Sequence, residues 1–273
     1  MSEVLNHRQP TWAIGPVEAT LRNRRDAGHK LLVAYVTGGV TENWPDHVRA
    51  IRDAGADAVE IGIPFSDPVI DGPVIQQASV RALDRGTTPE RLLTELASTD
   101  LAVPLIAMTY YNLVLQAGHR HFAERLVAAG VRAAILPDLP LGESAEWESD
   151  AAAAGVETVL LAAPVTPDDR LRLICARSRG FVYGMGLMGV TGERAALAAS
   201  AVTMAARLKA MTDKPVLIGV GVSNPDNASQ ISGVADGVII GAPVMRRIVD
   251  GASPGEVATM ITGFRAALDS VAG

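Results

Sequence analysis

Eight short apolar runs alternate with longer amphipathic segments along this chain, and that alternation limits the possible folds more than any other feature. The predicted strands are four to seven residues long, with one shorter, and consist mostly of Val, Ile, Leu and Ala. They cover Leu31–Thr37, Ala58–Ile63, Val103–Met108, Ala133–Leu136, Thr158–Leu161, Phe181–Tyr183, Pro215–Gly219 and Gly237–Ile240. Continuous apolar runs of this length are typical of strands buried on both faces, as in parallel sheets.

A helical pattern follows each predicted strand. The predicted helices are Trp44–Ala54, Val74–Leu83, Phe122–Ala129, Glu143–Ala154, Asp168–Arg177, Ala195–Met211, Pro225–Ser232 and the short Pro243–Val249. Strict alternation of strand and helix implies a parallel sheet. Eight such units in about 250 residues match a (β/α)8 TIM barrel better than an open doubly wound sheet. An extra N-terminal helix, from near Gly15 to Ala27, is expected to cap the bottom of the barrel. The open sheet stays as the alternative, because the sixth strand is short.

Composition narrows the class of protein. With 48% apolar and 20% charged residues, the 273-residue chain is expected to fold, and residues 1–273 contain no linker-like segment, so we expect one domain. The net charge of −6 argues against nucleic-acid binding. No apolar run of about 18 residues and no signal-peptide pattern occur, which favours a cytoplasmic protein without a membrane span.

Cysteine and histidine offer no evident chemistry. The single Cys175 excludes an intramolecular disulfide and a Cys-based zinc site, and its place in an amphipathic helix indicates packing. The His119–His121 segment is expected at a solvated helix start. No histidine spacing suggests a metal, and no glycine motif matches a dinucleotide site. We therefore expect neither a metal nor a cofactor.

One carboxylate stands out because the active site of a (β/α)8 barrel lies at the C-terminal ends of its strands. Glu60 lies inside the second apolar run, and strand alternation places it on the same side as Ala58 and Gly62. Burial raises the pKa of such a carboxyl group, which suits proton transfer near neutral pH. The alternative is a buried glutamate held by one structural Lys, Arg or Tyr.

A second carboxylate, Asp71, follows in a loop that contains three prolines, which restrict its backbone. Asp71 could lie over the mouth of the barrel, although Asp-Gly is also common in turns. Glycine-rich segments follow the sixth, seventh and eighth strands, at Gly184–Gly192, Gly219–Ser223 and Gly241–Met245. Glycines and a helix N-terminus at these places are typical of a phosphate site in a barrel, although turns need glycine as well.

The segment from Glu60 to Pro73, EIGIPFSDPVIDGP, closely resembles the signature of the tryptophan synthase α subunit family. Shorter matches follow in order at Met108–Asn112, Pro137–Pro140, Gly189–Gly192 and Gly219–Ser223. The resemblance runs from about Leu31 to Val249. It implies a (β/α)8 barrel that cleaves indole-3-glycerol phosphate to indole and glyceraldehyde 3-phosphate, a retro-aldol lyase step without a cofactor.

The resemblance also implies roles for individual residues. Glu60 would shuttle protons, Asp71 would accept the indole N–H, and Tyr183 would lie near the substrate. Thr191 would orient the aspartate when a loop closes. The residues implied to enclose the indole are Tyr35, Met108, Ile135 and Val220. The phosphate would be held by backbone groups of Gly192, Gly221, Gly241 and Ala242.

Some positions depart from the family pattern, among them one in the site and one loop. Ala242 stands where the family commonly has Ser, so that one hydroxyl donor to the phosphate is missing. The first loop, Thr37–Glu42, lacks the usual Asp-Pro element and borders the surface that meets the β subunit in the family. Asp67, Asn112 and Pro140, at partner-facing positions, are retained. The resemblance thus implies a β subunit in an α2β2-type assembly, with a stand-alone lyase or a weakly active allosteric partner as alternatives.

Overall fold

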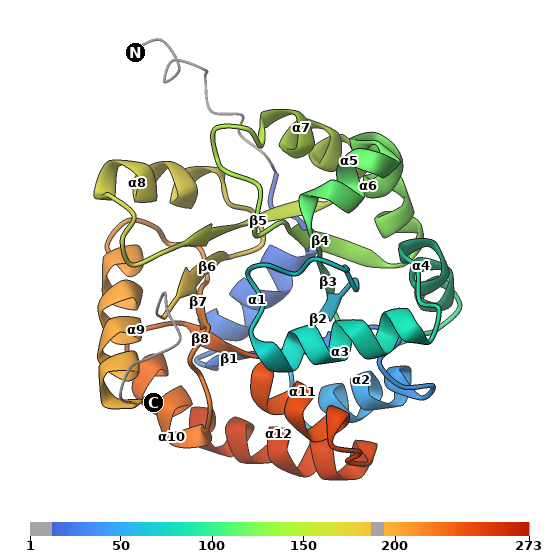
Figure 1. Cartoon of the computed structure of the whole chain (residues 1–273). Helices are drawn as coiled ribbons and strands as arrows, with labels where there is room; N and C mark the ends of the chain where they lie inside the picture. The colour runs from blue at the N-terminus through green and yellow to red at the C-terminus, as the bar shows by residue number, and fades with distance from the viewer. Residues whose placement is uncertain (1–12, 187–193, 273) are drawn as a thin grey trace.

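The computed structural model describes residues 13–186 and 194–272, in which eight parallel strands close into a barrel (Figure 1). The strands are β1 (Leu31–Thr37), β2 (Ala58–Gly62), β3 (Leu105–Met108), β4 (Val131–Ile135), β5 (Glu157–Ala162), β6 (Val182–Met185), β7 (Val216–Gly219) and β8 (Gly237–Ile240). Each strand pairs with the next along the chain, and β8 returns to β1 with Leu31 opposite Gly237. The predicted barrel is confirmed and the open sheet is excluded.

Helices surround the ring of strands (Figure 1). Twelve occur in the described ranges: α1 (Pro16–Asp26), α2 (Trp44–Asp53), α3 (Pro73–Asp84), α4 (Pro89–Ala97), α5 (Tyr111–Ala117), α6 (His119–Ala128), α7 (Ala145–Ala154), α8 (Asp168–Arg177), α9 (Arg194–Lys209), α10 (Pro225–Ser232), α11 (Ala242–Val249) and α12 (Pro254–Asp269). The predicted helices are present, with ends that differ by a few residues. Helices α4, α5 and α12 were not predicted, because we expected a single helix between most neighbouring strands.

Alternating side chains of the strands build two cores. On β1, Leu31 and Val33 belong to an inner core within the barrel, whereas Leu32, Ala34 and Val36 belong to the outer core beneath the helices. On β2, Ala58 points inward and the residues on either side of Glu60 point outward. The predicted side of Glu60 is therefore confirmed.

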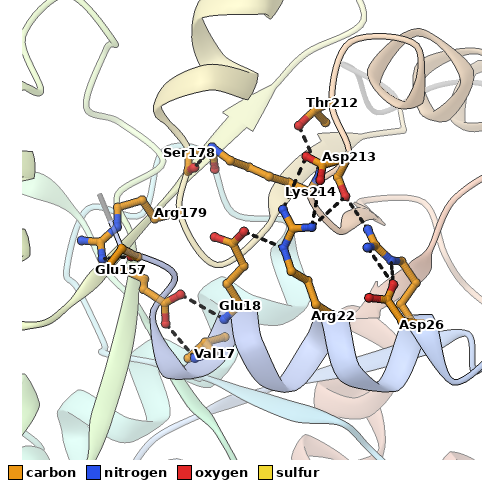
Figure 2. A network of polar contacts seen from close by, with 12 residues as sticks. Val17, Glu18, Arg22, Asp26, Glu157, Ser178, Arg179, Thr212, Asp213 and Lys214 are labelled. Carbon is orange, nitrogen blue, oxygen red and sulfur yellow. Dashed lines mark hydrogen bonds and ion pairs between the residues drawn. The ribbon is translucent and has the colours of Figure 1, made fainter. Parts of the chain in front are cut away.

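Helix α1 closes the N-terminal end of the barrel, as predicted. Its residues Val17 and Leu21 are part of the inner core. Figure 2 shows how the helix start is held: the Glu157 carboxylate, on the first residue of β5, accepts the backbone N–H groups of Val17 at 2.7 Å and Glu18 at 3.0 Å. These donors are otherwise unpaired at a helix N-terminus. The opposite end of the barrel stays open for a site.

Two expectations about single side chains have different outcomes. Cys175 is buried within α8, as predicted. His119 was expected to be solvated, but its side chain is only 10% exposed, and its Nε2 lies 2.9 Å from the Tyr111 hydroxyl. The correction arises because α5 and α6 pack side by side, an arrangement that the sequence pattern did not indicate. None of the helices within the described ranges is long and apolar enough to cross a membrane.

Candidate active site

A cavity of about 250 Å³ lies at the C-terminal end of the barrel. Nine residues predicted from the sequence line it: Tyr35, Glu60, Asp71, Met108, Tyr183, Val220, Gly221, Gly241 and Ala242. They come from strands on several sides of the ring and from the loops after β2, β7 and β8. The structure thus brings the two carboxylates and the glycine-rich segments after β7 and β8 into one cavity.

The remaining predicted residues lie elsewhere. Ile135, at the end of β4, is fully buried in the inner core and is not among the residues that line the cavity. Thr191 and Gly192 lie outside the described residues. Asp67, Asn112 and Pro140 are exposed, in the loop after β2, on α5 and in the loop after β4 respectively.

Glu60 is buried at the base of the cavity, with 1% of its surface exposed. Its Oε2 atom is buried and has no hydrogen-bond partner among the described residues, and no Lys or Arg there forms an ion pair with it. The structural alternative, a glutamate held by one fixed partner, therefore finds no support. Burial, and then the charge of Asp71, raise the pKa of Glu60 to about 8, so that this carboxyl group is protonated at neutral pH.

Asp71 approaches the same cavity from the loop between β2 and α3. Its loop is fixed by a hydrogen bond of 2.8 Å from the Gln76 side chain to the Asp71 carbonyl oxygen. Burial raises the pKa of Asp71 to about 6, and a hydrogen bond from Tyr110 opposes this shift. At neutral pH the cavity therefore holds one protonated and one ionised carboxyl group.

Tyr110 is a residue of the site to which the sequence analysis gave no role. It directly precedes α5, it is 5% exposed, and its ring stacks on Phe65 with the centroids 5.1 Å apart. Its hydroxyl accepts the backbone N–H of Ile70 at 3.1 Å and bonds the Asp71 side chain. It therefore anchors the loop that carries the second carboxylate. Its place in the matched segment Met108–Asn112 was the available signal.

Two other tyrosines, Tyr35 and Tyr183, line the cavity. The hydroxyl of each lies so close to the neighbouring strand that only a glycine fits there. A Cβ atom at Gly62 would overlap the Tyr35 hydroxyl, and one at Gly219 would overlap the Tyr183 hydroxyl. Burial, together with the charges of Glu60 and Asp71, raises the pKa of both phenols well above the ordinary value. Both hydroxyl groups stay protonated and can donate hydrogen bonds.

The part of the cavity formed after β7 and β8 is suited to an anion. Helix α11 begins at Ala242, directly after Gly241, and both residues line the cavity together with Gly221. Backbone N–H groups at a helix N-terminus favour negative charge. Val220, beside Gly221, has a φ of 60°, a conformation that is strained for a β-branched residue. Two carboxyl groups and backbone suited to an anion thus line one cavity.

Comparisons with known proteins agree with this geometry. Residues 21–266 match the family model of the tryptophan synthase alpha chain. The chain is 42% identical over 240 residues to the tryptophan synthase alpha chain of Streptomyces coelicolor, covering 85% of this chain and 87% of the relative.

Solved structures share the fold over nearly the whole chain. The tryptophan synthase subunit alpha of Legionella pneumophila has a TM-score of 0.85 at 30% identity, covering 94% of this chain and 100% of that one. A chain of Mycobacterium tuberculosis tryptophan synthase has a TM-score of 0.86 at 30% identity, with 94% and 99% covered. The chain therefore belongs to the tryptophan synthase alpha chain family and is an indole-3-glycerol-phosphate lyase.

Proposed function

We propose that Glu60 and Asp71 carry the lyase reaction of this chain on indole-3-glycerol phosphate. The protonated Glu60 gives its proton to C3 of the indole ring, while the Asp71 carboxylate accepts the indole N–H and stabilises the positive charge on the ring. The Glu60 carboxylate then takes the proton of the adjacent side-chain hydroxyl. The carbon–carbon bond breaks, its electron pair returns to the ring, and indole and glyceraldehyde 3-phosphate leave.

The observation that carries this proposal is the environment of Glu60. A buried carboxyl oxygen without a partner is costly, and such groups in native proteins call for an explanation. A proton-transfer role supplies one, because a general acid or base has to keep an atom free for the substrate. Asp71, in the same cavity, supplies the negative charge that the protonated indole needs.

The other predicted residues fit the remainder of the substrate. Gly221, Gly241 and Ala242, with Gly192 from the loop after β6, would hold the phosphate through backbone N–H groups. Tyr35, Met108 and Val220 would enclose the ring, with Tyr183 near the reacting carbon. Thr191 would orient Asp71, and Ile135 would support the wall of the cavity from the inner core.

We also propose that residues 1–273 form one domain.

The test is indole release from indole-3-glycerol phosphate by the purified chain and its Glu60→Gln variant. Turnover should be abolished, because the amide cannot exchange a proton, whereas binding of glycerol 3-phosphate should persist. Glu146→Gln, at an exposed position on α7, is the matched control and should retain full activity. Substantial turnover by Glu60→Gln would contradict the assignment.

We propose that the chain works with a β subunit in an α2β2-type assembly. The exposed residues Asp67, Asn112 and Pro140 follow the neighbouring strands β2, β3 and β4 at the open end of the barrel. A structurally similar chain belongs to a solved structure of Mycobacterium tuberculosis tryptophan synthase. The altered first loop favours a second candidate, a stand-alone lyase that releases indole. The missing hydroxyl at Ala242 favours a third, a weakly active allosteric partner.

The same assay with an added tryptophan synthase β subunit separates these three functions. Low activity that rises strongly with the β subunit is expected of the α2β2 assembly. High activity that ignores the β subunit would identify a stand-alone lyase. Near-zero activity in both conditions, with stimulation of the β reaction, would identify an allosteric partner.

A further inference from the structure

Tyr35, proposed above to enclose the indole ring, also brings a phenolic hydroxyl group into the cavity. It lies on β1 directly opposite Glu60 on β2 in the strand register. Its side chain extends from Gly241, where a Cβ atom would lie 3.4 Å from the Tyr35 Cβ, to Gly62, where a Cβ atom would overlap its hydroxyl. The phenol thus points towards the side of the cavity from which Glu60 comes.

The hydrogen of this hydroxyl is available for donation. Thr37, two residues along β1 and fully buried, donates its own hydroxyl hydrogen to the Tyr35 oxygen at 3.2 Å. That bond occupies an acceptor site of Tyr35 and leaves the phenolic hydrogen without an acceptor among the described residues. Burial, the charge of Asp71 and the charge of Glu60 raise the pKa of Tyr35, so that the donor stays protonated.

An unsatisfied acceptor of the described site belongs to the neighbouring strand. Glu60 Oε2 is buried without a partner in residues 13–186 and 194–272. Glu60 and Tyr35 point to the same side of two paired strands. The titratable groups that face Glu60 in the described residues are Asp71, Tyr35 and Tyr183. Since Asp71 repels the Glu60 carboxylate, stabilisation has to come from the phenols.

We propose that Tyr35 is a positioning residue for Glu60: its hydroxyl, held by Thr37, donates a hydrogen bond to the Glu60 carboxyl group when substrate fills the cavity. This inference rests on the proposed proton-transfer role of Glu60. The bond fixes the orientation of the Glu60 carboxyl group and stabilises the carboxylate that forms when Glu60 gives up its proton. Catalytic hydrogen bonds that are open in the free enzyme commonly tighten in the substrate complex.

The main experiment compares Tyr35→Phe with Tyr111→Phe in the purified full-length chain, using indole release over a range of pH. Tyr35→Phe removes one hydroxyl and leaves the ring. We expect kcat to fall about tenfold or more, KM to change little, and the basic limb of the pH profile to move about one unit upward. The upward direction follows because the Glu60 carboxylate loses a donor, which favours its protonated form.

Tyr111→Phe is the matched control, since its hydroxyl faces His119 outside the cavity, and both its kcat and its pH profile should stay unchanged. Thr37→Val is a second variant, which keeps the Tyr35 hydroxyl but removes the Thr37 hydroxyl that donates to it. It should also move the basic limb upward, by less than Tyr35→Phe does. Thermal unfolding and binding of glycerol 3-phosphate establish that each variant is folded.

Three results would overturn the inference. The first is a Tyr35→Phe variant with the activity and pH profile of Tyr111→Phe. The second is a fall in kcat with an unshifted basic limb, which would place the hydroxyl on the substrate. The third is a basic limb that does not shift in Thr37→Val. This result is decisive even if Tyr35→Phe does not fold. Failure of the underlying function is distinguishable, because Glu60→Gln would then stay active.

Discussion

Ala242 is the cavity residue at which the family resemblance led us to expect a serine instead. It opens α11 beside the proposed phosphate, and its methyl group offers no hydrogen-bond donor. Ala242→Ser should therefore lower the KM for indole-3-glycerol phosphate about tenfold or more, because a hydrogen bond to a charged group contributes about 1.5–3 kcal/mol. Steady-state kinetics measure this effect. Ala252→Ser, in the loop after α11, is the control, and equal KM values in both variants would contradict the prediction.

Single residues also mark what the sequence could and could not predict. Glu60 was predictable because a carboxylate within an apolar strand has to point to one side, and the neighbouring Ala58 and Gly62 indicated which side. Tyr110 was not, because its bonds to Ile70 and Asp71 join positions about 40 residues apart in the chain. The partner of a tyrosine hydroxyl depends on where a separate loop lies, and the local pattern contains no such information.

At the scale of elements, Asp57 joins three parts of the fold at the closed end of the barrel. Its carboxylate accepts hydrogen bonds from Arg24 of α1 at 2.8 Å, from the Leu32 N–H of β1 at 2.8 Å and from Arg265 of α12 at 3.4 Å. Only 2% of the side chain is exposed.

Asp57→Asn should lower the free energy of unfolding by about 1–3 kcal/mol, since an amide has one acceptor oxygen and no charge for the two arginines. Urea unfolding measures the loss. The control is Asp53→Asn, whose side chain is 66% exposed and, within the part of the chain that the structure describes, pairs only with the adjacent Arg52. A change of at most about 0.5 kcal/mol is expected there. Equal losses in the two variants would refute this account of Asp57.

The elements differed in how well the sequence predicted them. The strands were found because each is a short apolar run, and β1 and β8 have the predicted ends. Helices α4 and α12 were not predicted, because we assumed one helix after each strand. Both nevertheless begin with recognisable caps, at Thr88 and Ser253. In α12, Gly255 and Gly263 weaken the helical pattern, and packing against α2 and α10 compensates for it.

At the scale of the whole molecule, closing the barrel forces two carboxyl groups into one small cavity. The register of β1 and β2 and the anchoring of the β2–α3 loop by Tyr110 both contribute to this arrangement. Burial raises the pKa of Asp71 to about 6 and that of Glu60 to about 8. The proposed mechanism requires Asp71 ionised and Glu60 protonated, and this combination predominates only between those two values.

We therefore expect a bell-shaped pH dependence of kcat/KM, with an acid limb near pH 6 and a basic limb near pH 8. Activity falls below the acid limb as Asp71 takes up a proton, and above the basic limb as Glu60 loses its own. Because a phosphate monoester also ionises with a pKa of about 6, binding of glycerol 3-phosphate over the same pH range shows how much of the acid limb comes from the substrate. Activity that stays constant up to well above pH 8 would show that Glu60 does not act from its protonated form.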